Sequence, residues 1–320
     1  MLPRIALPLL VTLLFARQPD AADRFGPIAW SPDGETLIAY HEGRISELPF
    51  VESRPNSRTD SLPTPLALAV DWEGGCLAVS VPAAVARVDV YRRGSLQPVL
   101  SLAGLPARAT FLEAKGSELL LAGPGFFERR ALPEGTFIDT LRWKPPREPL
   151  DLQRGGRRET LLLGGRIVRL NGEPEFGPLP SSGEPIALTG GGEPPGLLLL
   201  DGARVLLARS GSPSIVVADL QTGERPFGAL LAPGGELVLL ALRAWEGSPP
   251  EPRPRVEVRN AASGDVEKRF RSARLVGGKK LYESPRAAAF DPSGRYLAII
   301  WPLAGAQIWD TRTWELTTMY

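Results

Sequence analysis

The sequence predicts an all-β protein, a β-propeller of seven blades with four antiparallel strands in each. Three observations support this fold class. A turn signal recurs seven times at a spacing close to 40 residues, each turn joins two short apolar strands, and the strand after the turn is often apolar on both faces. A strand of that kind needs cover on both sides. Small sheets that stack around a central channel give each other that cover.

The last unit shows the pattern most clearly, in residues 288–316 with the sequence AAFDPSGRYLAIIWPLAGAQIWDTRTWEL. Its Asp291-Pro292-Ser293-Gly294 is a turn, because proline presets φ at the second position and glycine accepts a positive φ. Residues 295–301 are apolar on both alternating faces. Segments 306–309 and 314–320 then complete four short strands within one unit.

The first unit repeats this order. Residues 28–30 precede the turn Ser31-Pro32-Asp33-Gly34, and strands are predicted over residues 36–40 and 44–48. Weaker copies between the two ends have turns at residues 73–75, 115–117, 155–156 and 233–235, and a degenerate copy covers residues 186–202.

The apolar residues before the seven turns mark the repeat. Their spacings are 40, 41, 41, 36, 43 and 59 residues, for Trp30, Val70, Phe111, Leu152, Leu188, Leu231 and Phe290. The long final spacing indicates an insertion, which we assign to two connections, residues 246–255 and 271–285. Long loops on a rigid scaffold are common binding sites.

The last unit resembles a repeat of the WD-repeat or WD-like propeller family. The likeness lies in an F-x-P-x-G-x-x-L-A core that begins at Phe290, the Trp309-Asp310 dipeptide and the Thr311-Arg312-Thr313 turn. Residues 29–40 and 215–224 match other parts of the repeat, so the resemblance covers residues 26–320. The family's Gly-His dipeptide is absent, since His41 is the only histidine. The resemblance implies a propeller that acts as an interaction platform. Among exported propellers that resemble this one, it also implies lactone-cleaving enzymes and redox-partner subunits.

Residues 1–22 are predicted to be a signal peptide, and residues 23–320 a single propeller domain. Arg4 precedes an apolar run over residues 5–16, with small residues at Ala16, Ala21 and Ala22. The run is shorter than the ~20 residues that a membrane-spanning helix needs. We therefore expect export to the periplasm or the cell exterior and no stable membrane span, with an uncleaved membrane anchor as the alternative.

The charge composition excludes one class of partner. The formal net charge is +1, from 37 Lys and Arg against 36 Asp and Glu. A protein that binds nucleic acid through bulk electrostatics carries a clear positive excess. We therefore expect no nucleic-acid partner. Separately, we expect the protein to be a monomer that binds another protein.

The sequence offers little catalytic chemistry. His41 is interpreted as an exposed residue in a turn between two strands, and no G-x-S-x-G nucleophile elbow occurs. Zinc motifs, EF-hand loops and phosphate-binding loops are also missing from the sequence. Cys76, the only cysteine, lies in an apolar strand and is interpreted as a core residue. We therefore assign no catalytic residue, no cofactor and no metal site, although carboxylates from several blades could bind calcium without a sequence signature.

Two functions fit these observations. The first is a non-catalytic exported scaffold whose loop face presents Arg and Trp side chains to a protein partner, since these side chains are common hot spots. The second is a lactonase-like hydrolase or a redox-partner subunit with a carboxylate or metal site in the central funnel. The candidate partner-binding residues are Trp72, Arg92, Arg93, Arg129, Arg130, Arg157, Arg158, Trp245 and Arg253. The alternatives are a solvated rim for the arginines and packing between blades for the tryptophans.

Overall fold

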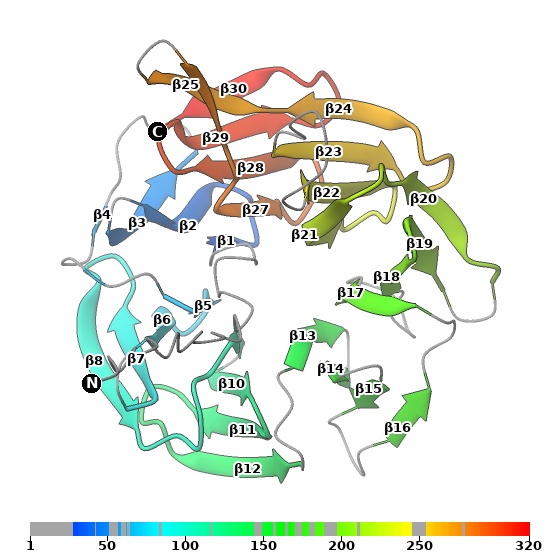
Figure 1. Cartoon of the computed structure of the whole chain (residues 1–320). Coiled ribbons are helices and arrows are strands. Elements are labelled where there is room, and N and C mark those ends of the chain that lie inside the picture. Colours follow the sequence, from blue (N-terminus) through cyan, green and yellow to red (C-terminus); the bar gives the residue numbers. More distant parts are fainter. Residues whose placement is uncertain are drawn as a thin grey trace, which may run out of the picture.

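The computed structural model describes residues 28–320 apart from residues 42, 51–56, 59–61, 63–64, 83–84, 116, 144–148, 156–157, 164–165, 170–174, 179–182, 189–196, 210–211, 245–253 and 277–278. Every regular element in this described part is a β-strand, which confirms the predicted all-β class. The strands form seven four-stranded antiparallel sheets and one two-stranded hairpin. Figure 1 shows the sheets arranged as a ring.

Within each four-stranded sheet the strands follow chain order, and we name them A to D from the centre of the ring outward (Figure 1). The first two sheets contain β1 (Ile28–Trp30), β2 (Thr36–His41), β3 (Arg44–Pro49), β4 (Ser57–Arg58), and β5 (Ala67–Asp71), β6 (Cys76–Val81), β7 (Arg87–Arg92), β8 (Gln97–Ala103). The third and fourth contain β9 (Phe111–Lys115), β10 (Glu118–Gly123), β11 (Phe126–Ala131), β12 (Phe137–Arg142), and β13 (Pro149–Gly155), β14 (Arg158–Leu163), β15 (Arg166–Arg169), β16 (Glu175–Pro178).

The remaining sheets complete the ring. The fifth and sixth contain β17 (Glu184–Leu188), β18 (Leu197–Asp201), β19 (Arg204–Ala208), β20 (Ile215–Asp219), and β21 (Glu224–Leu231), β22 (Leu237–Ala244), β23 (Arg255–Asn260), β24 (Val266–Phe270). The hairpin of β25 (Ser272–Val276) and β26 (Lys279–Glu283) follows, and the seventh sheet contains β27 (Ala287–Phe290), β28 (Tyr296–Trp301), β29 (Gly305–Asp310) and β30 (Leu316–Met319).

The seven marker residues of the predicted repeat occupy equivalent places in the structure. Each of the seven marker residues lies in the A strand of its sheet, from Trp30 in β1 to Phe290 in β27. The inserted hairpin of β25 and β26 lies in the last and longest spacing. The connection between β22 and β23, the other proposed insertion, falls almost wholly outside the described residues.

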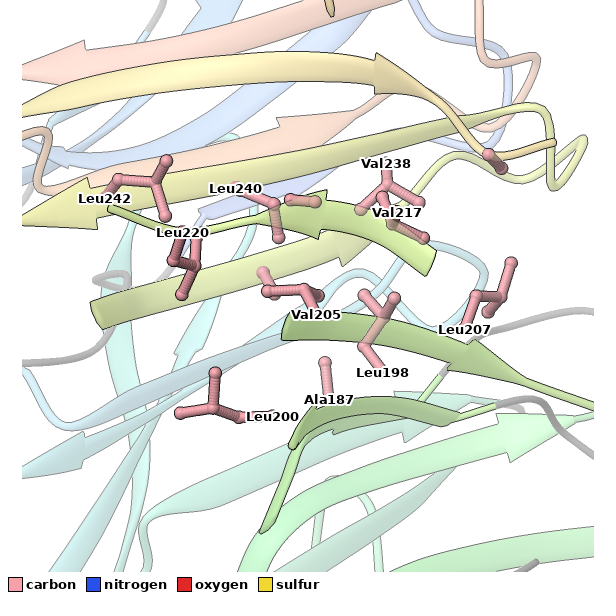
Figure 2. Close-up of a cluster of buried hydrophobic side chains, with 13 residues drawn as sticks. Ala187, Leu198, Leu200, Val205, Leu207, Val217, Leu220, Val238, Leu240 and Leu242 are labelled. Atoms are coloured by element: carbon pink, nitrogen blue, oxygen red, sulfur yellow. The ribbon is translucent and has the colours of Figure 1, made fainter. Parts of the chain in front are cut away.

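The apolar core lies between neighbouring sheets. In β22, Val238, Leu240 and Leu242 pack against the fifth sheet, as Figure 2 shows, whereas Leu239 and Ala241 pack against the seventh. All five are completely buried. The apolar side chains on both faces of a B strand therefore serve two different interfaces, and β28 divides its side chains in the same way.

The ring closes without a shared strand. The seventh sheet takes all four strands from residues 287–319, and the first sheet takes its strands from residues 28–58. A buried cluster that includes Trp30, Leu37, Ala298 and Ile300 joins the two sheets. Hydrogen bonds add to it: the hydroxyl of Tyr320 donates to the carbonyl oxygen of Pro49. Closure therefore depends on side chains.

Candidate partner-binding face

The turns between A and B strands and those between C and D strands lie at the same edge of each sheet, because neighbouring strands are antiparallel. We name this edge the A–B/C–D face. Turns on this face contact the adjacent sheet. Arg209 after β19 donates to the carbonyl oxygen of Gly235 at 3.2 Å, and the Gly94 N–H donates to Glu47 Oε1 at 3.1 Å. The face is therefore continuous from one sheet to the next at these points.

Trp72 and Arg93 meet on this face of the second sheet. Trp72 lies in the A–B turn and Arg93 in the C–D turn. The guanidinium carbon of Arg93 lies 4.0 Å from the centroid of the Trp72 ring, and its Nη1 donates to the Trp72 carbonyl oxygen at 3.3 Å. The arrangement is a cation–π contact reinforced by a hydrogen bond.

The local sequence explains how Trp72 is positioned. Asp71, which ends β5 and is 1% exposed, accepts a hydrogen bond from the Gly74 N–H at 3.0 Å and so closes the turn. A Cβ on residue 74 would collide with the Asp71 carboxylate. Glycine is therefore required where the chain passes over this carboxylate.

Glu47 of the first sheet also lies close to Arg93. Its Oε1 lies 3.6 Å from Arg93 Nε, and its side chain is only 7% exposed. Asp33 in the neighbouring A–B turn contributes a further negative charge. Hydrogen bonds from the Ser31 hydroxyl and the Glu35 N–H lower the pKa of Asp33 below its usual 3.8, and Arg93 lowers it further. The Trp72–Arg93 pair thus lies at the junction of two sheets, with its cation next to the Glu47 carboxylate.

The arginines of the predicted doublets have different surroundings. Arg92 is exposed, whereas Arg93 is half-buried. In the third sheet, Arg130 Nη2 lies 2.6 Å from Glu128 Oε2, and Arg129 Nε lies 3.6 Å from Asp139 Oδ1. Three of these four arginines therefore bind carboxylates of the protein itself, and Arg92 is the one that stands exposed.

The structure brings several predicted residues to one face. Those at the A–B/C–D face of sheets two to four are Trp72, Arg92, Arg93, Arg129, Arg130 and, by its main-chain position at the start of β14, Arg158. Arg157, Trp245 and Arg253 lie outside the described residues. Trp245 and Arg253 belong to the connection between β22, a B strand, and β23, a C strand.

The only cysteine and the only histidine of the chain lie in different settings. Cys76 is 7% exposed and packs in the cluster between the second and third sheets, which confirms it as a core residue. Burial raises the pKa of its thiol, and the negative charge of Asp71 adds to this effect. The prediction that His41 lies in a turn was wrong: it is the last residue of β2, paired with Arg44, because the strand extends one residue further than the apolar pattern.

Sequence reasoning missed a network of buried carboxylates. Glu257 in β23 is completely buried and binds Arg255, Arg259 and Arg269, with Nε or Nη to Oε distances of 2.8, 2.5 and 3.0 Å. Arg255 also binds Glu224 of β21. Burial alone would raise the pKa of Glu257, but hydrogen bonds from Arg255 and Arg259 outweigh it and lower that pKa below 4.5. The alternation Arg-x-Glu-x-Arg in β23, which places the three charges on one face, could have revealed the network.

The described part lacks two kinds of feature. It holds no group of three or more His, Cys, Asp or Glu side chains suited to a metal ion. It also contains no helix long and apolar enough to cross a membrane.

Comparison with known proteins identifies the fold. No family model and no curated protein matches the chain. Among solved structures, a putative 6-phosphogluconolactonase from Bacteroides fragilis matches with a TM-score of 0.59 and 14% identity, over 90% of this chain and 95% of that one. The β-propeller domain of Myceliophteria thermophila Cps50 (Swd1) matches with a TM-score of 0.55 and 16% identity, over 79% and 85%. Hsv2 from Kluyveromyces lactis matches with a TM-score of 0.50 and 13% identity, over 77% and 73%.

The chain is therefore a β-propeller. At these identities the likeness extends to the fold and not to an activity.

Proposed function

We propose that the protein is a non-catalytic scaffold, a seven-bladed WD-like propeller that binds a protein partner through its A–B/C–D face. The supporting observation is the Trp72–Arg93 pair, which lies at a junction of two sheets and remains partly exposed beside Arg92. The WD-like resemblance of the last unit agrees with this role.

The physical argument is pre-organisation. A free arginine loses side-chain entropy when a partner fixes it. Arg93 is already held in place by the Trp72 ring and by Glu47. It therefore loses less side-chain entropy when a partner binds. Trp and Arg are also the residues enriched in binding hot spots. Exposed Arg92 favours a partner with a carboxylate at this point.

Photo-crosslinking tests this proposal. A photoreactive amino acid replaces Arg92 in one variant and Val85 in another, and each variant is irradiated in the native cell. Val85 is a matched control because it belongs to the same sheet, is 60% exposed and lies in the B–C connection at the opposite edge. We expect a discrete protein adduct from position 92 that the Trp72→Ala exchange removes. Equal adducts from both positions, or none from a folded chain at position 92, would contradict the proposal.

We also propose that residues 1–22 direct export and are removed, and that the mature protein is a monomer. The supporting observation is the pattern of Arg4, the apolar run and the small residues after it. Mass spectrometry of the amino terminus of the protein isolated from its own cells tests this point. An intact Met1 in the membrane fraction would instead support the uncleaved anchor.

The alternative function is a lactonase-like hydrolase or a redox-partner subunit. What favours it is the match to the putative 6-phosphogluconolactonase, which spans 90% of this chain. Metal analysis of the purified protein and a screen of lactone hydrolysis test it. Turnover of a lactone at a rate that scales with bound metal would replace the scaffold proposal.

A further inference from the structure

The connection between the sixth and seventh sheets concentrates positive charge. The residues of this connection, 271–286, contain five Lys or Arg and a single acidic residue, Glu283, for a net charge of +4 in a chain whose total is +1. Three of these cations, Arg271, Lys280 and Arg286, are exposed. No ion pair forms between any of these three and an acidic side chain of the described part. The charge is therefore available to a partner.

The same segment is a two-stranded hairpin with unpaired edges. β25 and β26 pair with each other, and no other strand of the described part pairs with either. The outer edge of β25 thus has no strand partner in the described part, and its N–H and C=O groups can pair with an added strand. An isolated two-stranded ribbon is only marginally stable, so a third strand would also stabilise it.

One face of the hairpin carries an exposed apolar residue among the charges. Leu275 lies opposite Lys280 in the ladder, and Ala273 lies opposite Tyr282 on the same face. Leu275 is 71% exposed, the largest exposed fraction among the large apolar side chains of the described part. Apolar residues on edge strands invite pairing with another chain, so this face suits a ligand strand of alternating charged and apolar residues.

On the other face, a side-chain hydrogen bond joins the two strands at the base of the hairpin. Ser272 and Glu283 are paired across the ladder, and the Ser272 hydroxyl donates to Glu283 Oε2 at 3.1 Å. Glu283 is only 9% exposed. The base of the hairpin is therefore closed by a contact between its own strands and is largely shielded from solvent at Glu283. Figure 1 draws β25 at the upper left, at the outline of the ring.

We propose that the hairpin binds an extended acidic segment of a protein partner as an added strand along β25. Main-chain hydrogen bonds to the free edge supply the pairing. Carboxylates of the ligand face Arg271 and Lys280, and an apolar ligand side chain covers Leu275. Since the hairpin joins a D strand to an A strand, it lies at the edge opposite the A–B/C–D face. The proposal for the hairpin and the proposal for the A–B/C–D face therefore concern different edges of the propeller and can be tested separately.

Fluorescence anisotropy with the full-length mature protein tests this proposal. The probe is a short labelled peptide of alternating Glu and Val, measured at about 50 mM and about 500 mM salt, where screening differs strongly. Two further peptides carry N-methyl groups at one or the other set of alternate residues. We expect saturable binding that weakens with salt, and a loss of about tenfold in affinity for one of the two methylated peptides, because methylation removes the hydrogen bonds of one peptide edge.

Variants of the protein complete the test. Leu275→Ser and Lys280→Glu should each weaken binding about tenfold. Arg44→Glu is the matched control, an equal change of charge at an exposed residue of β3, and should leave affinity unchanged. No binding of the unmodified peptide, or equal binding of both methylated peptides, would overturn the proposal. Hairpin-dependent binding to anionic phospholipid vesicles without binding of the peptide would also overturn it, in favour of a lipid surface.

Discussion

Trp30 donates its indole N–H to the carbonyl oxygen of Ala289 at 3.2 Å, although 259 positions separate the two residues. The contact joins the A strands of the first and seventh sheets. Trp30 is 8% exposed and packs in the apolar cluster between these sheets. This single side chain therefore contributes both apolar burial and a hydrogen bond to ring closure.

Exchange of Trp30 should separate the two contributions. Trp30→Phe keeps an aromatic ring and leaves the Ala289 carbonyl without its donor, which should lower the free energy of unfolding by about 1 kcal/mol. Trp30→Ala also empties the site and should cost about 3–5 kcal/mol. Urea denaturation followed by far-UV circular dichroism measures both. Equal losses in the two variants would show that packing at this position does not support closure.

The Glu257 network should be essential for stability. Glu257→Ala leaves Arg259 without its carboxylate and Arg255 with Glu224 alone, and removal of one partner from a buried ion pair costs about 3–5 kcal/mol. Arg204→Ala is the control, because Arg204 and Asp219 are 64% and 78% exposed and such pairs contribute less than about 1 kcal/mol. Chemical denaturation of both variants gives the comparison. A milder loss for Glu257→Ala than for Arg204→Ala would contradict the assignment.

Stability should fall in acid. Burial would raise the pKa values of Glu128, Glu224 and Glu257, but hydrogen bonds from arginine outweigh it, so all three lie below the ordinary 4.5 in the folded protein. A group whose folded pKa is lowered contributes stability above its unfolded pKa and loses it as the pH falls through the folded value. Thermal unfolding should therefore show a constant Tm near neutral pH and a decline below about pH 4.5. The Glu257→Gln variant should show a shallower decline, and an unchanged slope would count against the role of Glu257.

Cys76 should be unreactive in the native protein. It is 7% exposed, and burial raises the pKa of its thiol, so little thiolate forms and little reagent reaches it. Ellman's reagent should label it only in denaturant. Rapid labelling of the native protein would mean that β6 opens locally.

The fold could be predicted because its signals are local. Each marker residue and its turn lie within a few positions of each other, and turn chemistry acts at that range. The Trp72–Arg93 pair needs more: the A–B and C–D turns meet only once the order of strands in the sheet is known. Glu47 comes from another sheet, and no spacing in the sequence predicts its contact with Arg93. The surroundings of Arg129 and Arg130 could not be predicted from the doublet itself for the same reason. Each side chain binds a carboxylate of the same sheet, Asp139 for Arg129 and Glu128 for Arg130.

The closure of the ring by side chains alone makes the molecule a candidate for circular permutation. In a propeller whose last sheet borrows a strand from the opposite terminus, one connection differs in kind from all the others. Here every described sheet is built from consecutive residues, so the seam between β30 and β1 resembles the other interfaces. A chain that started at β5 and joined its old termini by a linker would keep every sheet whole. The position at which translation begins is thus separable from the architecture that it builds.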